Sequence, residues 1–323
     1  MKTIAIEEHF SLVEVERALG RESAAGTNAV GPRAALSRKL ADLGAERLAD
    51  MDAAGITVQV LSLVAPGTQT LDAAAAAPLA RLANDRLAEA IAAHPDRYAG
   101  FATLPTPDPR AAAGELERAV TTLGLTGAMI HGTTGGRFLD DPAFWPIFEA
   151  AEHLDVPLYL HPAEPPAAVR AAYYAGFAPE VEFLLATSGW GWHIETGLHV
   201  LRLILAGVFD RFPRLRVVIG HMGEALPFFL ARTSGRLSPA ITGLPRTVEE
   251  YLRTHVFITT SAFFTPPPLR CALEVLGADR ILFAVDYPYS ANTAGRAFLD
   301  TAPLDPADRE LIAHGNAERL LGL

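Results

Sequence analysis

The chain has 323 residues, with 27 basic and 37 acidic side chains, so its formal charge at pH 7 is −10. Clustered positive charge is needed to bind nucleic acid or an anionic membrane surface, and neither partner is expected for an acidic chain without a basic run. Only Lys2 and Lys39 are lysines, so a lysine-based active site has two candidates. The single cysteine, Cys271, excludes an internal disulfide and a cysteine-rich metal site.

Hydrophobic patterning predicts a cytoplasmic location. No run of about 18 apolar residues lacks a polar, Gly or Pro break, so no membrane-spanning helix is expected. The N-terminus lacks the apolar core of a signal peptide, because Glu7 and Glu8 follow only a few apolar residues.

Short β-branched runs alternate with amphipathic helical patterns along the chain. The eight predicted strands are Thr3–Ile6, Thr57–Ser62, Tyr98–Thr103, Ala128–His131, Pro157–His161, Arg216–Gly220, Val256–Thr260 and Ile281–Val285. The predicted helices include Leu48–Ala54, Ala74–Ala93, Arg110–Thr122, Pro142–His153, Leu198–Asp210, Ala225–Arg236, Val248–Leu252, Arg270–Leu276 and Asp308–Leu320. This alternation indicates parallel β/α construction, and eight units favour a closed (β/α)₈ TIM barrel over an open sheet.

Two segments are too long for a minimal barrel. Ser11–Glu46 follows the first strand, and Pro162–Thr196 follows the fifth. Each segment is interpreted either as a lid or pocket wall, or as a packing or oligomer surface, and the sequence does not choose. No linker rich in Pro, Gly or Ser divides the chain, so residues 1–323 are expected to form one domain.

Acidic and imidazole side chains gather where these strands end. They are Glu7, His9, His131, His161, His221 and Asp286. In a barrel the C-terminal strand ends converge on one mouth, where active sites lie. Taken singly, each residue has another reading, since a histidine is often packed in the core and an aspartate before a helix is often its N-cap. The combination at several strand ends favours a functional site.

Glu7 and His9 are two residues apart, so in a strand they point to the same face and Glu8 points away. Inward ligands from strands one, five and eight would give a set of nitrogen and oxygen donors. Such a set suits Zn²⁺, Mn²⁺ or Fe²⁺.

At this point the motifs resemble a known family. They are Ala5–Phe10, Arg47–Asp52, Leu61–Leu63, Phe144–Phe148, Leu160–Pro162, Leu203–Asp210, Gly220–Glu224 and Arg280–Phe283. Together they are similar, nearly end to end, to the amidohydrolase-2 branch of the amidohydrolase superfamily. This branch contains nonoxidative decarboxylases of γ-resorcylate, 2,3-dihydroxybenzoate, 5-carboxyvanillate and aminocarboxymuconate semialdehyde.

The resemblance implies a barrel that binds one divalent metal ion, Zn²⁺ or Mn²⁺. The implied ligands are Glu7, His9, His161 and Asp286. The resemblance also implies that His221 and Glu224 lie beside the substrate and that Arg47 and Arg232 lie near its polar groups. Tyr287, which follows Asp286 near the mouth, is also expected to contact the substrate. A homo-oligomer, either a dimer or a tetramer, is expected on the same ground.

The expected activity is decarboxylation of a hydroxylated aromatic or related unsaturated carboxylic acid. Protonation of the ring carbon that bears the carboxyl group, followed by loss of CO₂, restores aromaticity. Asp286 or His221 could deliver the proton, with Glu224 setting the charge and tautomer of the imidazole. The alternatives are a hydrolase that opens a lactone or amide with a metal-bound water, and a noncatalytic protein on a degenerate barrel.

Two departures from the family pattern leave the identity of the acid open. The segment Tyr287-Pro288-Tyr289-Ser290 stands where these decarboxylases commonly have Trp-Pro-Phe-Glu, and Ala163-Glu164 stands where many have an arginine. Near the mouth, His193 is left open between a pocket role and a structural one.

Overall fold

The computed structural model describes residues 1–21 and 31–323. The strands in this part are β1 (Ile4–Phe10), β2 (Val58–Leu63), β3 (Tyr98–Gly100), β4 (Ala102–Thr103), β5 (Ala128–His131), β6 (Leu158–His161), β7 (Val217–Ile219), β8 (Val256–Thr259) and β9 (Ile281–Leu282). All named pairings between them are parallel, in the orders β1-β2-β3 and β4 through β9. β3 and β4 are the two halves of one predicted strand, interrupted at Phe101.

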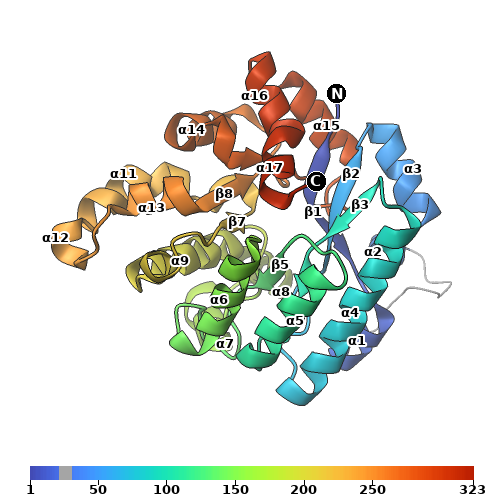
Figure 1. The fold of residues 1–323 in the computed structure, drawn as a ribbon, viewed down its shortest axis with the longest axis horizontal. Helices are drawn as coiled ribbons and strands as arrows, with labels where there is room; N and C mark the ends of the chain where they lie inside the picture. Colours follow the sequence, from blue (N-terminus) through green and yellow to red (C-terminus); the bar gives the residue numbers. More distant parts are fainter. Residues whose placement is uncertain (22–30) are drawn as a thin grey trace.

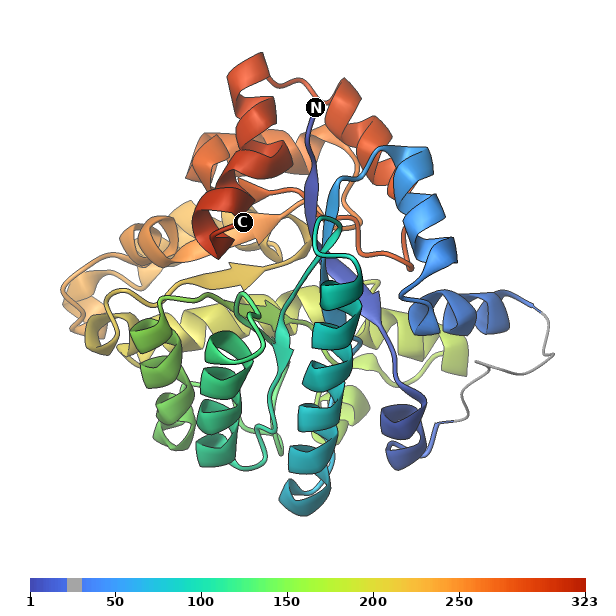
Figure 2. The same ribbon diagram turned by 45° about the vertical axis from the view of Figure 1, so that its right-hand side comes forward.

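Backbone hydrogen bonds join these two groups of strands. The amide of Phe101 donates to Leu61 O at 2.9 Å on one side. On the other side Ile6 N lies 3.1 Å from Phe283 O, and His9 N lies 2.7 Å from Tyr287 O. The first strand therefore lies beside the segment that follows the last one (Figure 2). The predicted barrel is confirmed.

The helices pack outside the strands (Figure 1). They are α1 (Val13–Ala18), α2 (Pro32–Ala41), α3 (Ala45–Ala54), α4 (Ala73–Ala93), α5 (Pro109–Thr121), α6 (Trp145–Leu154), α7 (Ala167–Val169), α8 (Pro179–Ala186), α9 (Gly191–Leu205), α10 (Val208–Arg211), α11 (Leu226–Arg236), α12 (Pro239–Thr242), α13 (Val248–His255), α14 (Pro266–Leu276), α15 (Asn292–Thr301), α16 (Pro306–Glu310) and α17 (Asn316–Leu321). Short 3₁₀ or π turns lie at Pro142–Phe144, Arg170–Tyr174, His221–Gly223, Ala278–Arg280 and Leu311–Gly315. No helix in the described residues is both long and apolar enough to cross a membrane.

Both long segments contain helices that were not predicted. The first carries α1 and α2, and its residues 22–30 lie outside the described part of the chain. The second carries α7 and α8, and α9 begins within it at Gly191, seven residues before the predicted start at Leu198. The second segment is therefore mostly helical.

The first strand contains a β-bulge that changes which side chains face the barrel interior. Its register against β2 shifts between Ala5, which pairs with Gln59, and Glu8, which pairs with Leu61. Ile4 and Ile6 belong to the cluster that fills the barrel, whereas Ala5 and Phe10 belong to the cluster under the helices. With strict alternation Glu7 would face outward after Ile6; the extra residue of the bulge turns it inward.

Candidate metal centre and active site

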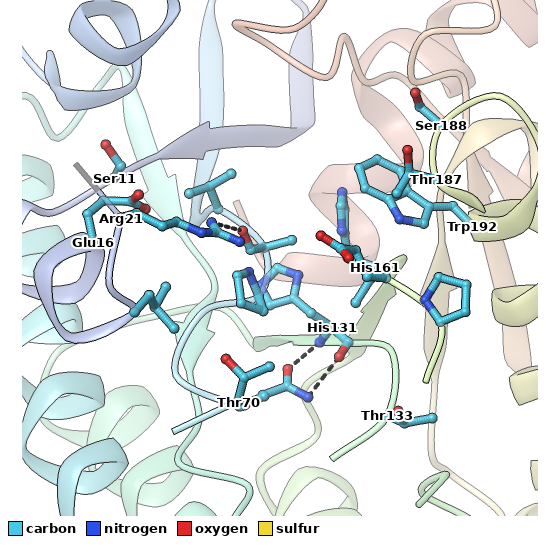
Figure 3. A pocket seen from close by; sticks show the side chains of 18 of the residues that line it. Ser11, Glu16, Arg21, Thr70, His131, Thr133, His161, Thr187, Ser188 and Trp192 are labelled. Carbon is cyan, nitrogen blue, oxygen red and sulfur yellow. Dashed lines mark hydrogen bonds between the residues drawn. The ribbon is translucent and has the colours of Figure 1, made fainter. Parts of the chain in front are cut away.

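A cavity of about 1450 Å³ opens over the C-terminal ends of the strands. Its floor includes His161 and Asp286, and residues from both long segments, such as Glu16 and Trp192, form its walls (Figure 3). Of the two readings of these segments, their contribution to the cavity supports the pocket wall.

Four predicted ligands come together at the cavity floor. Glu7, His9, His161 and Asp286 each place one donor atom so that all four lie within 4.8 Å of one another. His9 Nε2 is 3.3 Å from Asp286 Oδ1, and His161 Nε2 is 3.4 Å from Glu7 Oε1. Within residues 1–21 and 31–323, Glu7 Oε1 and His9 Nε2 are buried atoms without a hydrogen-bond partner. Both atoms can bind a metal through a lone pair, so one divalent cation would satisfy both.

Neighbouring groups hold the other polar atom of each of three ligands. Tyr159 and Thr259 donate their hydroxyls to Glu7 Oε2, which leaves Oε1 free. His161 Nδ1 donates to the Pro162 carbonyl at 2.7 Å, so its Nε2 carries the lone pair. The Ser62 hydroxyl lies 3.2 Å from His9 Nδ1. These contacts fix the ring orientations and direct the free atoms toward one point.

A second acidic residue, Glu8, fixes the fourth ligand. Glu8 is fully buried and faces away from the cavity, as predicted. Its carboxylate accepts hydrogen bonds from the amides of Val285 at 2.9 Å and Tyr287 at 3.1 Å. Asp286, between them, has a positive φ of 69°, a strained conformation for a residue with a side chain. Sequence reasoning missed this role, because it appears only when β1 meets the segment that follows β9.

His221 stands beside the ligand group and is part of a hydrogen-bonded chain. Its Nε2 lies 3.7 Å from Glu7 Oε1 and 3.9 Å from Asp286 Oδ2. Its Nδ1 lies 2.8 Å from Glu224 Oε1, and the other oxygen of Glu224 lies 2.6 Å from His193 Nδ1. The sequence had left His193 open, and the structure connects it to His221 through this carboxylate.

Burial and neighbouring charges shift the protonation of these groups. Burial raises the pKa of Glu7. Burial alone would lower the pKa of His221, but the carboxylates of Glu224 and Glu7 outweigh it and raise that pKa well above its ordinary value. Burial opposes ionisation of Asp286, but the nearby imidazoles of His221 and His9 outweigh it and lower its pKa. The surrounding charges therefore favour the charged form of His221 and the charged form of Asp286.

Three residues expected near the substrate are not among the described cavity walls. Arg47 is fully buried, and its guanidinium donates to the carbonyls of His9 at 2.6 Å and Asp42 at 2.8 Å. The guanidinium carbon of Arg47 lies over the Tyr287 ring, 4.8 Å from the ring centre, and the Tyr287 hydroxyl donates to Asp50. Arg232 is exposed on α11. Arg47 and Tyr287 both lie in the helix layer behind β1, so the structure does not place them where a substrate in this cavity would contact them. Tyr289 lines the cavity instead.

His131, which ends β5, lies close to the ligand group without belonging to it. His131 lines the cavity, and its ring packs edge-on against His161 with 5.1 Å between ring centres. Burial lowers the pKa of His131 to about 3, so the ring is neutral. His131 is not part of the ligand group, although the same signal, a histidine ending a strand, had singled it out.

A ring of parallel strands with converging carboxylates and imidazoles at its C-terminal mouth defines a metal-dependent barrel enzyme. Residues 9–323 match the model of the amidohydrolase family, and the chain belongs to that family. It is 37% identical to the decarboxylase orsB of Emericella nidulans, over 98% of this chain and 96% of that protein. It is equally 37% identical to a γ-resorcylate decarboxylase of Polaromonas sp., over 99% and 98% of the two chains.

Solved structures agree with these relatives. A dihydroxybenzoic acid decarboxylase from Polaromonas sp. JS666, with bound manganese and the inhibitor 2-nitroresorcinol, superimposes with a TM-score of 0.90. The two chains are 35% identical, and the match covers 100% of this chain and 97% of that one. The predicted family and the predicted enzyme class, a metal-dependent decarboxylase, are confirmed.

Proposed function

We propose that this protein removes CO₂ from a hydroxylated aromatic carboxylic acid bound in the cavity, without a redox cofactor. The observation that supports it most is the ligand group at the cavity floor, with His221 beside it and Glu224 on the far side of the His221 ring. Glu7, His9, His161 and Asp286 would hold one Zn²⁺ or Mn²⁺ ion. When bound, this ion supplies positive charge that orients the acid and polarises its phenol.

The protein's own groups supply the proton. Glu224 accepts a hydrogen bond from Nδ1 of His221 and helps to raise the pKa of the ring, while Nε2 faces Asp286 Oδ2. The proton is added to the ring carbon that bears the carboxyl group, from Asp286 or from His221. The C–C bond then breaks, its electron pair returns to the ring, and CO₂ leaves. Each turnover consumes one proton from solvent and restores the aromatic ring.

The test is incubation of the metal-loaded protein with a panel of hydroxybenzoates in ²H₂O. We expect CO₂ release and one deuterium at the former carboxyl position of the phenol. Asp286→Asn should fold and lose turnover. A panel that yields no CO₂ contradicts the proposal, and ¹⁸O from water appearing in the product of a lactone or amide would establish the hydrolase instead.

Assembly, location and domain structure are part of this proposal. Association into a dimer or tetramer is supported by exposed apolar side chains on α11 and α12, where Phe228 is 79% and Ile241 is 73% exposed. Size-exclusion chromatography with light scattering measures the subunit number, and a monomer contradicts it. A cytoplasmic location is proposed as well. One barrel domain would comprise residues 1–323.

A further inference from the structure

Two polar atoms beside the ligand group have no partner in the described residues. They are Nδ1 of His131 and Nε1 of Trp192, and both are buried. Each ring packs edge-on against His161, His131 at 5.1 Å and Trp192 at 6.3 Å between ring centres. Figure 3 shows the two side chains on different sides of His161 at the cavity. A buried polar group without a partner is costly, so two such groups in one binding cavity indicate contacts made by a ligand.

The chemistry of the free atom of His131 follows from its other nitrogen. Nε2 lies 3.1 Å from the carbonyl oxygen of Leu63, which can only accept, so Nε2 carries the proton. In a neutral ring Nδ1 is then a hydrogen-bond acceptor. The Cδ2–Nε2 edge of the ring faces Gly67, so the edge with Nδ1 is turned the other way. Gln69 accepts from the amide of His131 and donates to its carbonyl, which fixes this position.

Trp192 supplies the opposite chemistry. An indole N–H can only donate. The residue lies in the first turn of α9, where its amide donates to Thr187 O at 3.1 Å, and its side chain lines the cavity. The two flanks of a metal-ligating imidazole therefore carry one acceptor and one donor without a partner, each on a residue that lines the cavity.

We propose that His131 and Trp192 form a subsite that selects aromatic acids with a further ring hydroxyl, beyond the carboxylate and the ortho hydroxyl used at the metal. The ligand's O–H donates to Nδ1 of His131, and a ligand oxygen accepts from Nε1 of Trp192. The inference rests on the proposed function for the identity of the acid. It makes these two residues determinants of specificity, with no part in the proton transfer.

Matched variants separate the two contacts. Trp192→Phe keeps an aromatic ring but removes the N–H together with part of the indole, so the same truncation at a second tryptophan is needed beside it. His131→Gln places an amide donor near the former Nε2, so the Leu63 contact is kept and the acceptor is lost. His131→Asn does the reverse, because its amide oxygen lies near the former Nδ1. Trp190→Phe is the control, since Trp190 is 51% exposed and is not among the described cavity walls.

The ligands are 2-hydroxybenzoate, its four further hydroxylated isomers and the matching methoxy compounds. We expect wild type to prefer one dihydroxy isomer over 2-hydroxybenzoate by about tenfold or more for each hydrogen bond, in kcat/KM. Trp192→Phe should lower kcat/KM for the hydroxyl and methoxy compounds alike. His131→Gln should remove the preference for hydroxyl over methoxy, because methoxy accepts but cannot donate, and His131→Asn should retain it.

Equilibrium binding keeps this test independent of turnover. The decarboxylated phenols cannot react, and their dissociation constants, measured by calorimetry with Mn²⁺ present, should follow the same pattern. If no acid is decarboxylated but the phenols follow it, the proposed function fails and the subsite stands. The subsite is overturned if His131→Gln leaves unchanged the ratio of dissociation constants between hydroxyl and methoxy phenols and Trp192→Phe leaves the dissociation constants themselves unchanged. Unchanged ratios with weaker Mn²⁺ binding in His131→Gln also overturn it, since His131 would then serve the metal.

Discussion

Glu8 holds the backbone on both sides of Asp286. Its two carboxylate oxygens accept from the amides of Val285 and Tyr287, and Asp286 between them is kept at a φ of 69°. Adjacent acids in the sequence thus have different roles: Glu7 presents an oxygen to the cavity, and Glu8 stabilises the turn that aims the fourth ligand.

Glu8→Gln should therefore weaken metal binding although Glu8 is not a ligand. The amide group of glutamine is a donor and cannot accept from one of the two backbone amides, so the strained turn relaxes. We expect the dissociation constant for Mn²⁺ to rise about 10- to 100-fold, as measured by calorimetry. Glu117→Gln, on the exposed face of α5, is the matched control. An unchanged dissociation constant would falsify the positioning role.

Metal removal should lower the stability of the fold. The orphaned atoms of Glu7 and His9 are satisfied only by a cation, which binds the native state and not the unfolded one. At about 1,000 times its dissociation constant, Mn²⁺ should add about 4 kcal/mol to the free energy of unfolding. Denaturant titrations with Mn²⁺ and with a chelator measure this. In His161→Ala the two curves should nearly coincide, and a full metal effect in that variant would mean that the ligand set is wrong.

Glu224→Gln should slow turnover and shift its pH dependence. Glu224 helps to raise the pKa of His221, so loss of its charge lowers that pKa and depletes the imidazolium at neutral pH. We expect kcat to fall about 10²- to 10³-fold. The alkaline limb of the kcat profile should move to lower pH. A limb that stays in place would exclude His221 as the group that titrates.

Below neutral pH, His199 should destabilise the fold. Burial lowers its pKa to about 4, and its Nε2 accepts from the amide of Leu139 at 3.0 Å, which requires the neutral ring. In the unfolded chain His199 binds a proton near pH 6.5. The contribution of neutral His199 to the free energy of unfolding is therefore fully present above that pH and is lost as the pH falls toward 4. The loss is about 3 kcal/mol by linkage. His199→Gln keeps an acceptor and should remove this part of the slope in urea unfolding at several pH values; an equal slope would contradict the assignment.

Arg47→Ala should act on stability. Its guanidinium donates to the buried His9 carbonyl of β1 and to the partly buried carbonyls of Lys39 and Asp42, and all three would lose this donor. We expect a loss of about 3–5 kcal/mol in the free energy of unfolding, from denaturant titration. Arg110→Ala, at the exposed start of α5, should change it by less than about 0.5 kcal/mol. Normal stability with a raised KM would restore Arg47 as a substrate contact.

The sequence by itself determined the barrel and the ligand types. Eight apolar runs alternating with helices predict parallel strands, and the polar residues at their ends, such as His161 and Asp286, fall at one mouth because parallel strands share a direction. Helix boundaries in the second long segment were less predictable. The start of α9 at Gly191 depends on packing against neighbouring helices, among them α8 and α13, which local pattern does not contain.

Tertiary structure decided where side chains point. Strict alternation cannot place both Ile6 and Glu7 inside the barrel, and the bulge that does so exists only because β1 pairs with β2. Arg47 became a buried structural residue for the same kind of reason, since its acceptors come from distant segments. The unpartnered atoms of His131 and Trp192 are likewise visible only in three dimensions. Residue type and spacing specify what chemistry is available, but the satisfaction of each donor and acceptor is a property of the packed whole.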